Sequence, residues 1–363
     1  MKPHSQKFRT SRAAVALLLA AATLSACGPS DSKSDDSAES GSSGAPASTI
    51  SLVGFAVPKA ANDALQEAWT NTADGENVTF ETSYGASGDQ SRAVEAGKQA
   101  DYVHFSLEGD VTRLVKAGLV AEDWNAGPTK GIVSDSVVVL VVRKGNPKNI
   151  EGWDDVVKPG IGIVTPNPGS SGSARWNILA GWAHATAGST EGDSGSDEDG
   201  KEFITKFFEN AVTLAGSGRE ATTAFQGGTG DVLISYENEA IFARQSGEDF
   251  EYIIPDDTLL IENPAAVTKD ANPKAAKFLE FARSDDGQKI FASKGFRPVS
   301  DIEVGEVEGA NDPKDPFPAP KKLWTVADFG GWSDVNKKFF ATQEKDGADG
   351  IITAIQNASG KGN

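Results

Sequence analysis

Cysteine is almost absent from this 363-residue chain, because Cys27 is the only one. A single thiol cannot form an intramolecular disulfide, and it leaves no cysteine cluster for a structural zinc site. Histidine is scarce as well, with three in the whole sequence. Zinc sites and most acid–base or nucleophilic catalytic centres draw on these two residue types. We therefore expect no metal, no other cofactor and no enzymatic activity.

The sequence also lacks the short motifs that mark common catalytic sites. No HExxH, CxxC, GxSxG or Walker-type sequence occurs in it. His4 lies in a segment that we expect to be removed, His104 lies in a predicted strand, and His184 lies on a predicted apolar helix. We interpret His104 and His184 as packed core residues. An exported hydrolase is the alternative from another class, and it would require a nucleophile–base pair that these histidines do not supply.

Basic residues are also fewer than acidic ones. The chain has 34 Lys and Arg residues against 52 Asp and Glu residues, a net charge of −18. Such a balance leaves no basic stripe to neutralise phosphates, so nucleic-acid binding is excluded. An anionic ligand would gain nothing from long-range steering by this charge. A site for an anion would have to work through short-range dipoles and hydrogen bonds.

The first 26 residues have the pattern of a signal peptide. Four basic residues precede an apolar stretch at 13–22, which is too short to span a bilayer. Leu-Ser-Ala then leads directly into Cys27, as in the lipobox of bacterial lipoproteins. We predict that Cys27 carries a lipid that holds the protein outside the cytoplasm on the cell membrane; a chance cysteine after an ordinary signal peptide is the alternative. Residues 27–48 lack large apolar side chains and are predicted to form a flexible tether.

Beyond the tether, strand and helix patterns alternate, which predicts an α/β sheet with helices on both faces. Strands are predicted at residues 50–55, 77–84, 102–107, 137–143, 161–165, 212–215, 231–235, 251–255 and 265–268. Helices are predicted at residues 60–69, 88–96, 111–117, 153–157, 174–187, 220–225, 273–283 and 332–356. The acidic Gly/Ser segment 188–200 is predicted to be an exposed loop. The length suits two lobes, with 49–136 and 255–363 in lobe 1 and 137–254 in lobe 2.

Three Ser/Gly turns follow predicted strands and precede predicted helices. They are residues 84–88 (YGASG), 165–173 (TPNPGSSGS) and 215–219 (AGSGR). The start of a helix leaves backbone N–H groups unpaired and carries about half a positive charge. Glycine lets the backbone approach a ligand, and a serine hydroxyl adds a donor. Any one such turn is more often a simple helix cap. Three of them at the carboxyl ends of strands favour a shared site for an anion or a small polar ligand.

At these turns the sequence also resembles the periplasmic sulfate-binding protein family. The likeness extends in order over nearly all of the chain after the tether. It is carried by residues 141–148 (VVRKGNPK), 153–155 (WDD), 158–160 (KPG), 165–168 (TPNP), 174–177 (ARWN), 230–234 (GDVLI), 237–239 (ENE), 286–288 (DGQ), 296–298 (FRP) and 329–332 (FGGW).

The resemblance implies a two-lobed periplasmic-binding-protein-like (type II) fold with a ligand cleft between the lobes. It further implies a monomer that delivers sulfate to the permease and ATPase subunits of an ABC importer. The family holds the dehydrated dianion with neutral donors. Carried over to this sequence, the ligand-binding positions are Val57, Ser87, Gly88, Ser171, Gly172, Ser173, Gly218 and Tyr236. Arg219 is expected to support the third turn by pairing with Glu237 or Glu239.

Several positions depart from the family pattern. Val57 precedes Pro58 where the family often has aspartate, so only a main-chain donor survives there. The first turn begins with Tyr84 where many members have histidine. Tyr236 stands where a tryptophan indole is common, and a phenol can accept a hydrogen bond as well as donate one. These departures keep thiosulfate, molybdate and phosphate open as alternatives to sulfate.

Overall fold

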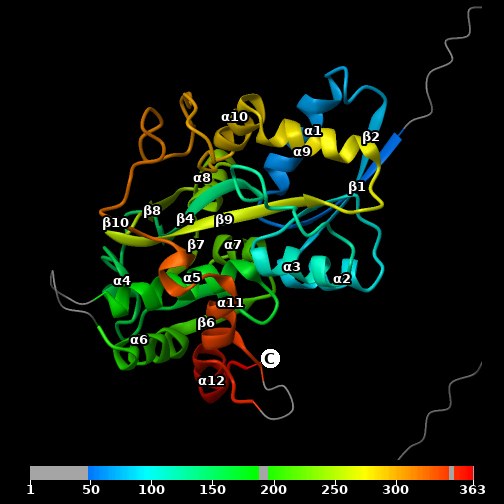
Figure 1. Ribbon diagram of the computed structural model, residues 1–363. Helices are drawn as coiled ribbons and strands as arrows, with labels where there is room; N and C mark the ends of the chain where they lie inside the picture. Colours follow the sequence, from blue (N-terminus) through cyan, green and yellow to red (C-terminus); the bar gives the residue numbers. More distant parts are fainter. Residues whose placement is uncertain (1–47, 188–194, 343–346, 363) are drawn as a thin grey trace, which may run out of the picture. The chain divides into compact units, whose positions relative to one another are not determined.

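The computed structural model describes residues 48–187, 195–342 and 347–362. The predicted signal peptide, the predicted lipid-bearing Cys27 and the predicted tether up to residue 47 lie outside the described residues. So does the part of the acidic segment at 188–194. The described chain forms a mixed sheet covered by helices (Figure 1).

The main path of the sheet has the order β2-β1-β3-β9-β4-β7-β5-β6. These strands are β1 (Ser48–Phe55), β2 (Val78–Gly85), β3 (Tyr102–His104), β4 (Ile132–Arg143), β5 (Ile163–Pro166), β6 (Ala211–Ala215), β7 (Val232–Tyr236) and β9 (Asp257–Val267). Two further strands join the path from the side: β8 (Phe250–Ile253) pairs with β4, and β10 (Lys322–Trp324) pairs with β9.

The sheet has a parallel set of strands at each end and antiparallel strands between them. We call β2, β1 and β3 the first half, and β7, β5 and β6 the second half. The long strands β4 and β9 pair antiparallel with each other and connect the two halves. β4 pairs with β9 up to Val137 and with β7 from Val138 onward. The pairing of β4 thus changes where the predicted second lobe begins.

Helices cover both faces of the first half, as predicted. Successive residues of a strand point to opposite faces. Leu52 and Tyr102 pack with α1 (Lys59–Thr70) and α9 (Pro273–Arg283), whereas their neighbours Val53 and Val103 pack with α2 (Ser87–Glu95) and α3 (Glu108–Lys116). The start of α9 shows local agreement between sequence and structure: Asn272 caps its first turn and proline occupies its first position.

The second half carries α4 (Trp153–Val156), α5 (Gly172–Thr186), α6 (Asp197–Asn210), α7 (Gly218–Gln226) and α8 (Glu237–Gln245). The remaining helices are α10 (Asp285–Ser293), a 3-10 turn (Val326–Phe329), α11 (Trp332–Val335), a π-helical turn (Asn336–Phe340) and α12 (Ile351–Ala358). α5 is apolar on nearly all sides and correspondingly buried, packing against both β9 and α6. It is therefore the central helix beneath the second Ser/Gly turn.

Several element predictions are wrong in their extent. The predicted helix 332–356 is broken, because Ala341 is extended and α12 starts only at Ile351. The predicted strand 102–107 pairs only as far as His104. The predicted loop 188–200 overlaps α6, which begins at Asp197, where Ser196 and Asp199 form a capping box. α6, α8 and α10 were not predicted, although α6 has an apolar face of Phe203, Ile204, Phe207 and Phe208.

Candidate functional site

Each Ser/Gly turn connects a strand to a helix, as predicted. α2 starts at Ser87 directly after β2, α5 starts at Gly172 after β5, and α7 starts at Gly218 after β6. The first N–H groups of each helix have no carbonyl partner within the helix, and the helix dipole makes these ends attractive to anions. The three turns therefore supply the backbone donors that the sequence suggested.

The first and second turns touch each other across the two halves of the sheet. The N–H group of Gly88 donates a hydrogen bond to the carbonyl oxygen of Ser170 at 3.2 Å. A Cβ atom added to Gly88 would lie only 3.0 Å from the same oxygen. The close approach of these two backbones therefore depends on glycine at position 88.

The third turn touches the second turn and the loop after β1. A Cβ atom added to Gly218 would lie 2.9 Å from Cγ2 of Val57 and 3.1 Å from Oγ of Ser173. In addition, the Nη2 group of Arg219 donates to the carbonyl oxygen of Val57 at 3.1 Å. The structure thus brings the predicted positions of all four segments together. All eight predicted ligand-binding residues are buried: Val57, Ser87, Gly88, Ser171, Gly172, Ser173, Gly218 and Tyr236.

The Ser87 hydroxyl is already engaged within the first half. It donates to Oδ2 of Asp110 at 2.6 Å and accepts from the N–H of Ser106 at 2.9 Å. Its single proton is therefore directed to the carboxylate. The N–H of Gly88 is also engaged, because it donates to Ser170. The donors that remain for a ligand at this turn are therefore the backbone N–H groups of Ser87 and Asp89.

Ser106 and Asn263 are polar residues of this region that the sequence did not single out. A Cβ atom on Gly172 would lie 2.8 Å from Oγ of Ser106, and this oxygen is 2.8 Å from the phenol oxygen of Tyr236. The Asn263 amide donates to the Ser106 carbonyl at 3.2 Å. Ser106 lies just beyond the carboxyl end of β3, a position that could have identified it.

Tyr236 places a protonated phenol among these neutral groups. Burial raises its pKa, although bonds to Ser106, Ser173 and Asn263 oppose the rise. The phenol therefore keeps its proton at physiological pH and can donate it.

Arg219 forms an ion pair with a buried carboxylate. Its guanidinium forms a two-point ion pair with Glu239, at 2.6 Å from Nη2 to Oε1 and 3.1 Å from Nε to Oε2. Glu239 is almost fully buried, at 1% exposure of its side chain. Of the two predicted partners the structure selects Glu239, because Glu237 pairs instead with Arg297 at 2.7 Å. This ion pair fixes the third turn relative to α8.

The acidic residues near the three turns do not offer a free carboxylate to the site. Asp89 and Glu220, at the starts of α2 and α7, are exposed, and Asp89 pairs with Arg92 at 2.5 Å. Asp110 is buried but already accepts from Ser87 and from Arg113, at 3.1 Å. The arrangement presents neutral donors to a ligand, which suits an anion that carries no proton.

Both mature histidines have structural partners, as predicted. His104 is fully buried, and its Nδ1 lies 3.1 Å from Oδ1 of Asn62. Burial lowers its pKa to about 3. Burial also lowers the pKa of His184, but hydrogen bonds to Asp257 (2.9 Å) and Asp154 (3.2 Å) outweigh it and the pKa is raised.

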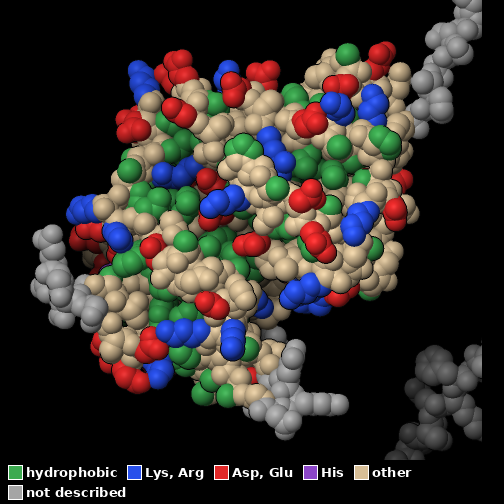
Figure 2. All heavy atoms as spheres, viewed as in Figure 1, with side chains coloured by type: hydrophobic (Ala, Val, Ile, Leu, Met, Phe, Trp, Pro, Cys, Tyr) green, Lys and Arg blue, Asp and Glu red, His purple; other side chains and the backbone are tan. Residues whose placement is uncertain are grey.

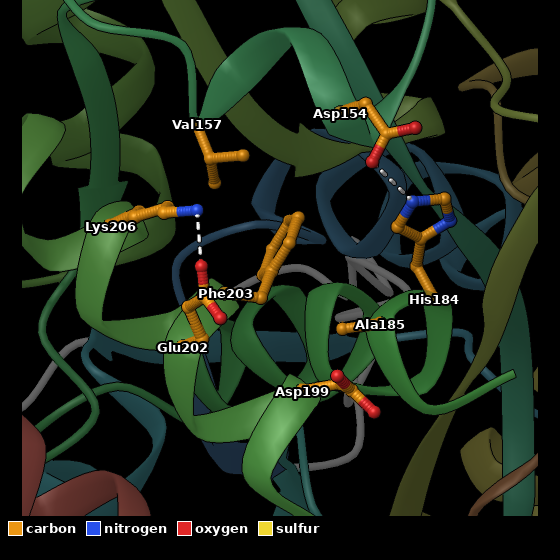
Figure 3. A pocket seen from close by; sticks show the side chains of 8 residues that line it. All are labelled: Asp154, Val157, His184, Ala185, Asp199, Glu202, Phe203 and Lys206. Atoms are coloured by element: carbon orange, nitrogen blue, oxygen red, sulfur yellow. Dashed lines mark hydrogen bonds and ion pairs between the residues drawn. The ribbon is translucent and has the colours of Figure 1, made fainter. Parts of the chain in front are cut away.

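The cavity drawn in Figure 3 lies away from the three turns, along α5 and α6. Its volume is about 310 Å³. His184 points toward Asp154 on one side, and Glu202 bonds Lys206 on the other, with Asp199 below (Figure 3). Three carboxylates against one lysine make this cavity unfavourable for an oxyanion.

Two further classes of site find no support in the part of the chain that the structure describes. Residues 48–187, 195–342 and 347–362 contain no cluster of His, Cys, Asp and Glu arranged to hold a metal ion. Over the same ranges, no helix combines the length and apolarity that crossing a membrane requires. On the face shown in Figure 2, acidic and basic side chains are interspersed without a continuous basic stripe.

Comparison with known proteins adds independent evidence. Residues 51–297 match the family model described as bacterial extracellular solute-binding protein. A sulfate-binding protein of Synechococcus elongatus is 40% identical over 331 residues, covering 88% of this chain and 89% of that protein. A thiosulfate-binding protein of Pseudomonas aeruginosa is 34% identical, covering 77% of this chain and 84% of that protein.

A solved structure is similar along the same region. The sulfate-binding protein SubI from Mycobacterium tuberculosis H37Rv superposes with a TM-score of 0.74 at 46% sequence identity. The match covers 81% of this chain and 100% of the SubI chain. The family-model match over residues 51–297 includes all three Ser/Gly turns.

Proposed function

This chain belongs to the sulfate-binding protein family of bacterial extracellular solute-binding proteins, and from that membership we propose that it captures sulfate for an ABC importer. The predicted periplasmic-binding-protein fold is confirmed, and the chain is a binding protein rather than an enzyme. An extracellular family also agrees with the predicted extracytoplasmic location.

The observation that supports sulfate is the convergence of three helix starts beside which Asp110 and Arg219 already have partners. Three helix starts meet through Gly88, Ser173 and Gly218, and Arg219 is held by Glu239. Sulfate is fully ionised at neutral pH, so it needs donors alone. Hydrogen bonds to a charged group contribute roughly 1.5–3 kcal/mol each. About six or seven would contribute roughly 10–20 kcal/mol before the costs of association and closure, whereas micromolar affinity needs only about 8 kcal/mol.

The second candidate ligand is a different oxyanion, because the Tyr236 phenol can accept a hydrogen bond as well as donate one. Phosphate carries a proton near neutral pH and gains from a carboxylate acceptor. Asp110 is the buried carboxylate nearest the first turn, but Ser87 and Arg113 already occupy it. This favours sulfate over phosphate. Thiosulfate and molybdate carry no such proton, and only titration separates them from sulfate.

The remaining parts of the proposal concern the whole molecule. Residues 49–136 and 255–363 would form lobe 1 and residues 137–254 lobe 2, with β4 and β9 as the connecting strands. Cys27 would carry the lipid that anchors the monomer to the membrane, and residues 27–48 would let it reach the permease and ATPase subunits of the importer.

The test is titration calorimetry of the mature protein with sulfate, thiosulfate, molybdate and phosphate at neutral pH. We expect one-to-one binding of sulfate that excess phosphate does not weaken. Binding of another oxyanion without sulfate binding would show that the proposed ligand is wrong. Hydrolysis of sulfate or phosphate esters by the protein would instead support the hydrolase alternative.

A further inference from the structure

Ser106 connects the two halves of the sheet through both its side chain and its backbone. It follows β3 in the first half, and its hydroxyl oxygen lies 2.8 Å from the phenol oxygen of Tyr236 at the end of β7 in the second half. Its carbonyl oxygen accepts from the indole N–H of Trp176 in α5 at 2.9 Å. These contacts exist only while the two halves lie close together at Ser106.

The surroundings of Ser106 leave its hydroxyl little room to turn elsewhere. The position of an added Cβ on Gly172 would be 2.8 Å from both Cβ and Oγ of Ser106. The backbone N–H of Ser106 is held by Ser87, and its carbonyl is held by Trp176 and Asn263. Ser106 is fully buried. Its hydroxyl is therefore a preorganised partner for Tyr236.

The direction of the bond between Ser106 and Tyr236 determines what the phenol offers a ligand. A phenol has one proton. When Ser106 donates to the phenol oxygen, the phenol proton is not used on Ser106 and can bond an anion in place of the other neighbours of the phenol, Ser173 and Asn263. When the phenol donates to Ser106 instead, only its lone pairs remain for the ligand. An anion without protons selects the first arrangement, because it presents acceptors alone.

We propose that Ser106 is a positioning residue that donates to Tyr236 and thereby commits the phenol to donating toward a fully ionised oxyanion. The inference rests on the proposed function for the identity and place of the ligand. With Ser106 present, the phenol oxygen already accepts one hydrogen bond, which makes it a poorer acceptor for the proton of hydrogen phosphate. Without Ser106, the phenol oxygen is a better acceptor for that proton, so the ratio of sulfate affinity to phosphate affinity falls.

The experiment compares Ser106→Ala, Tyr236→Phe and the double variant with the unaltered mature protein. Sulfate and phosphate affinities are measured for each by calorimetry. We expect Ser106→Ala to weaken sulfate binding about five- to tenfold while phosphate binding does not weaken. In the Tyr236→Phe background, Ser106→Ala should change sulfate affinity less than about twofold, because the partner is already missing.

Ser134→Ala is the matched control. Ser134 is a buried serine of β4 whose hydroxyl has no hydrogen-bond partner among the residues described in the structure. It should leave both affinities unchanged. Losses that simply add in the double variant, or an unchanged sulfate-to-phosphate ratio in Ser106→Ala, would overturn the inference, whatever happens to thermal stability.

The proposed function and this inference fail in different ways. If the unaltered protein does not bind sulfate but binds another oxyanion that carries no proton, the proposed ligand is wrong. The same cycle run with that anion then still shows whether Ser106 and Tyr236 act together. If the unaltered protein binds sulfate but the cycle shows no coupling, only the inference is wrong. If it binds none of the oxyanions, both are wrong.

Discussion

Replacing Gly172 by alanine should weaken ligand binding by obstructing the approach of the two halves. The new Cβ would lie 2.8 Å from Cγ of Leu107 and from Cβ and Oγ of Ser106. Real Cβ atoms essentially never come this close to other heavy atoms. All three are side-chain atoms of buried residues, and the Cβ of Ser106 is fixed to its backbone, so the loop that carries Ser106 must move.

The size of the effect follows from the cost of overpacking. Extra methyl groups in a well-packed region cost typically about 1–3 kcal/mol. Gly172 and its neighbours Ser106 and Leu107 come from different halves of the sheet. In the proposed two-lobed protein, separation of the halves would relieve the clash. The cost then falls on the closed, ligand-binding arrangement, and the dissociation constant should rise by roughly 5- to 150-fold. Alanine keeps the backbone N–H, so the change does not remove a donor.

The assay is sulfate titration of Gly172→Ala beside Gly227→Ala, both followed by urea unfolding. Gly227 lies at the far end of α7, and its added Cβ would meet backbone oxygens at ordinary distances of 3.4 and 3.5 Å. The control should bind as the unaltered protein does. Unchanged affinity in Gly172→Ala, with the fold intact, would refute the closed contact on which the site rests.

Three further changes probe other parts of the molecule. Ser171→Ala should weaken sulfate binding by roughly 1–3 kcal/mol in calorimetry, with little loss of stability because the Ser171 side chain makes no helix-cap bond; unchanged affinity would remove Ser171 from the site. Arg219→Met should lower the free energy of unfolding by about 3 kcal/mol, at the lower end for buried pairs because Arg219 is 30% exposed while Glu239 is 1% exposed; urea unfolding at neutral pH measures it, and a loss below about 1 kcal/mol would show that the pair is unimportant. Burial lowers the pKa of His104 to about 3, whereas the unfolded value is near 6.5. As the pH decreases below about 6.5, the unfolded state gains a proton that the folded state does not bind, so the free energy of unfolding should be about 2 kcal/mol lower at pH 5 than at pH 7.5. The difference in unfolding free energy between wild type and His104→Gln should show this pH dependence, and a constant difference would contradict it.

Local sequence signals predicted the elements that support the site. The β-branched run of β4 and the alternation in β2 required no tertiary information, because β-branched composition and a period of two favour a strand over a helix. The Ser/Gly turns were equally local. α6 was missed because its acidic first turn continues the composition of the preceding loop. The break after Phe340 contains no proline, and its two glycines, Gly347 and Gly350, come only at its end. A continuous helix was therefore predicted.

Local sequence patterns could not predict contacts between segments that are distant in the chain. Ser106 and Tyr236 are 130 residues apart, and only the strand order places the loop after β3 opposite the end of β7. The sequence offered two partners for Arg219, and the register of α8 against α7 and the C-terminal loops assigned Glu239 to it and Glu237 to Arg297.

The amino-acid sequence by itself determined the charge, the scarcity of catalytic residue types, the three helix starts and the family of this protein. Those properties are composition or local pattern, and they do not depend on how segments pack. The tertiary structure alone decided that the Ser87 hydroxyl serves Asp110, that Ser106 faces Tyr236 and that Gly172 must lack a side chain. Each of these is a contact between segments that are separated in the chain. The contact of Ser87 with Asp110 requires the first half to be folded, and the other two exist only once the sheet has brought its two halves together.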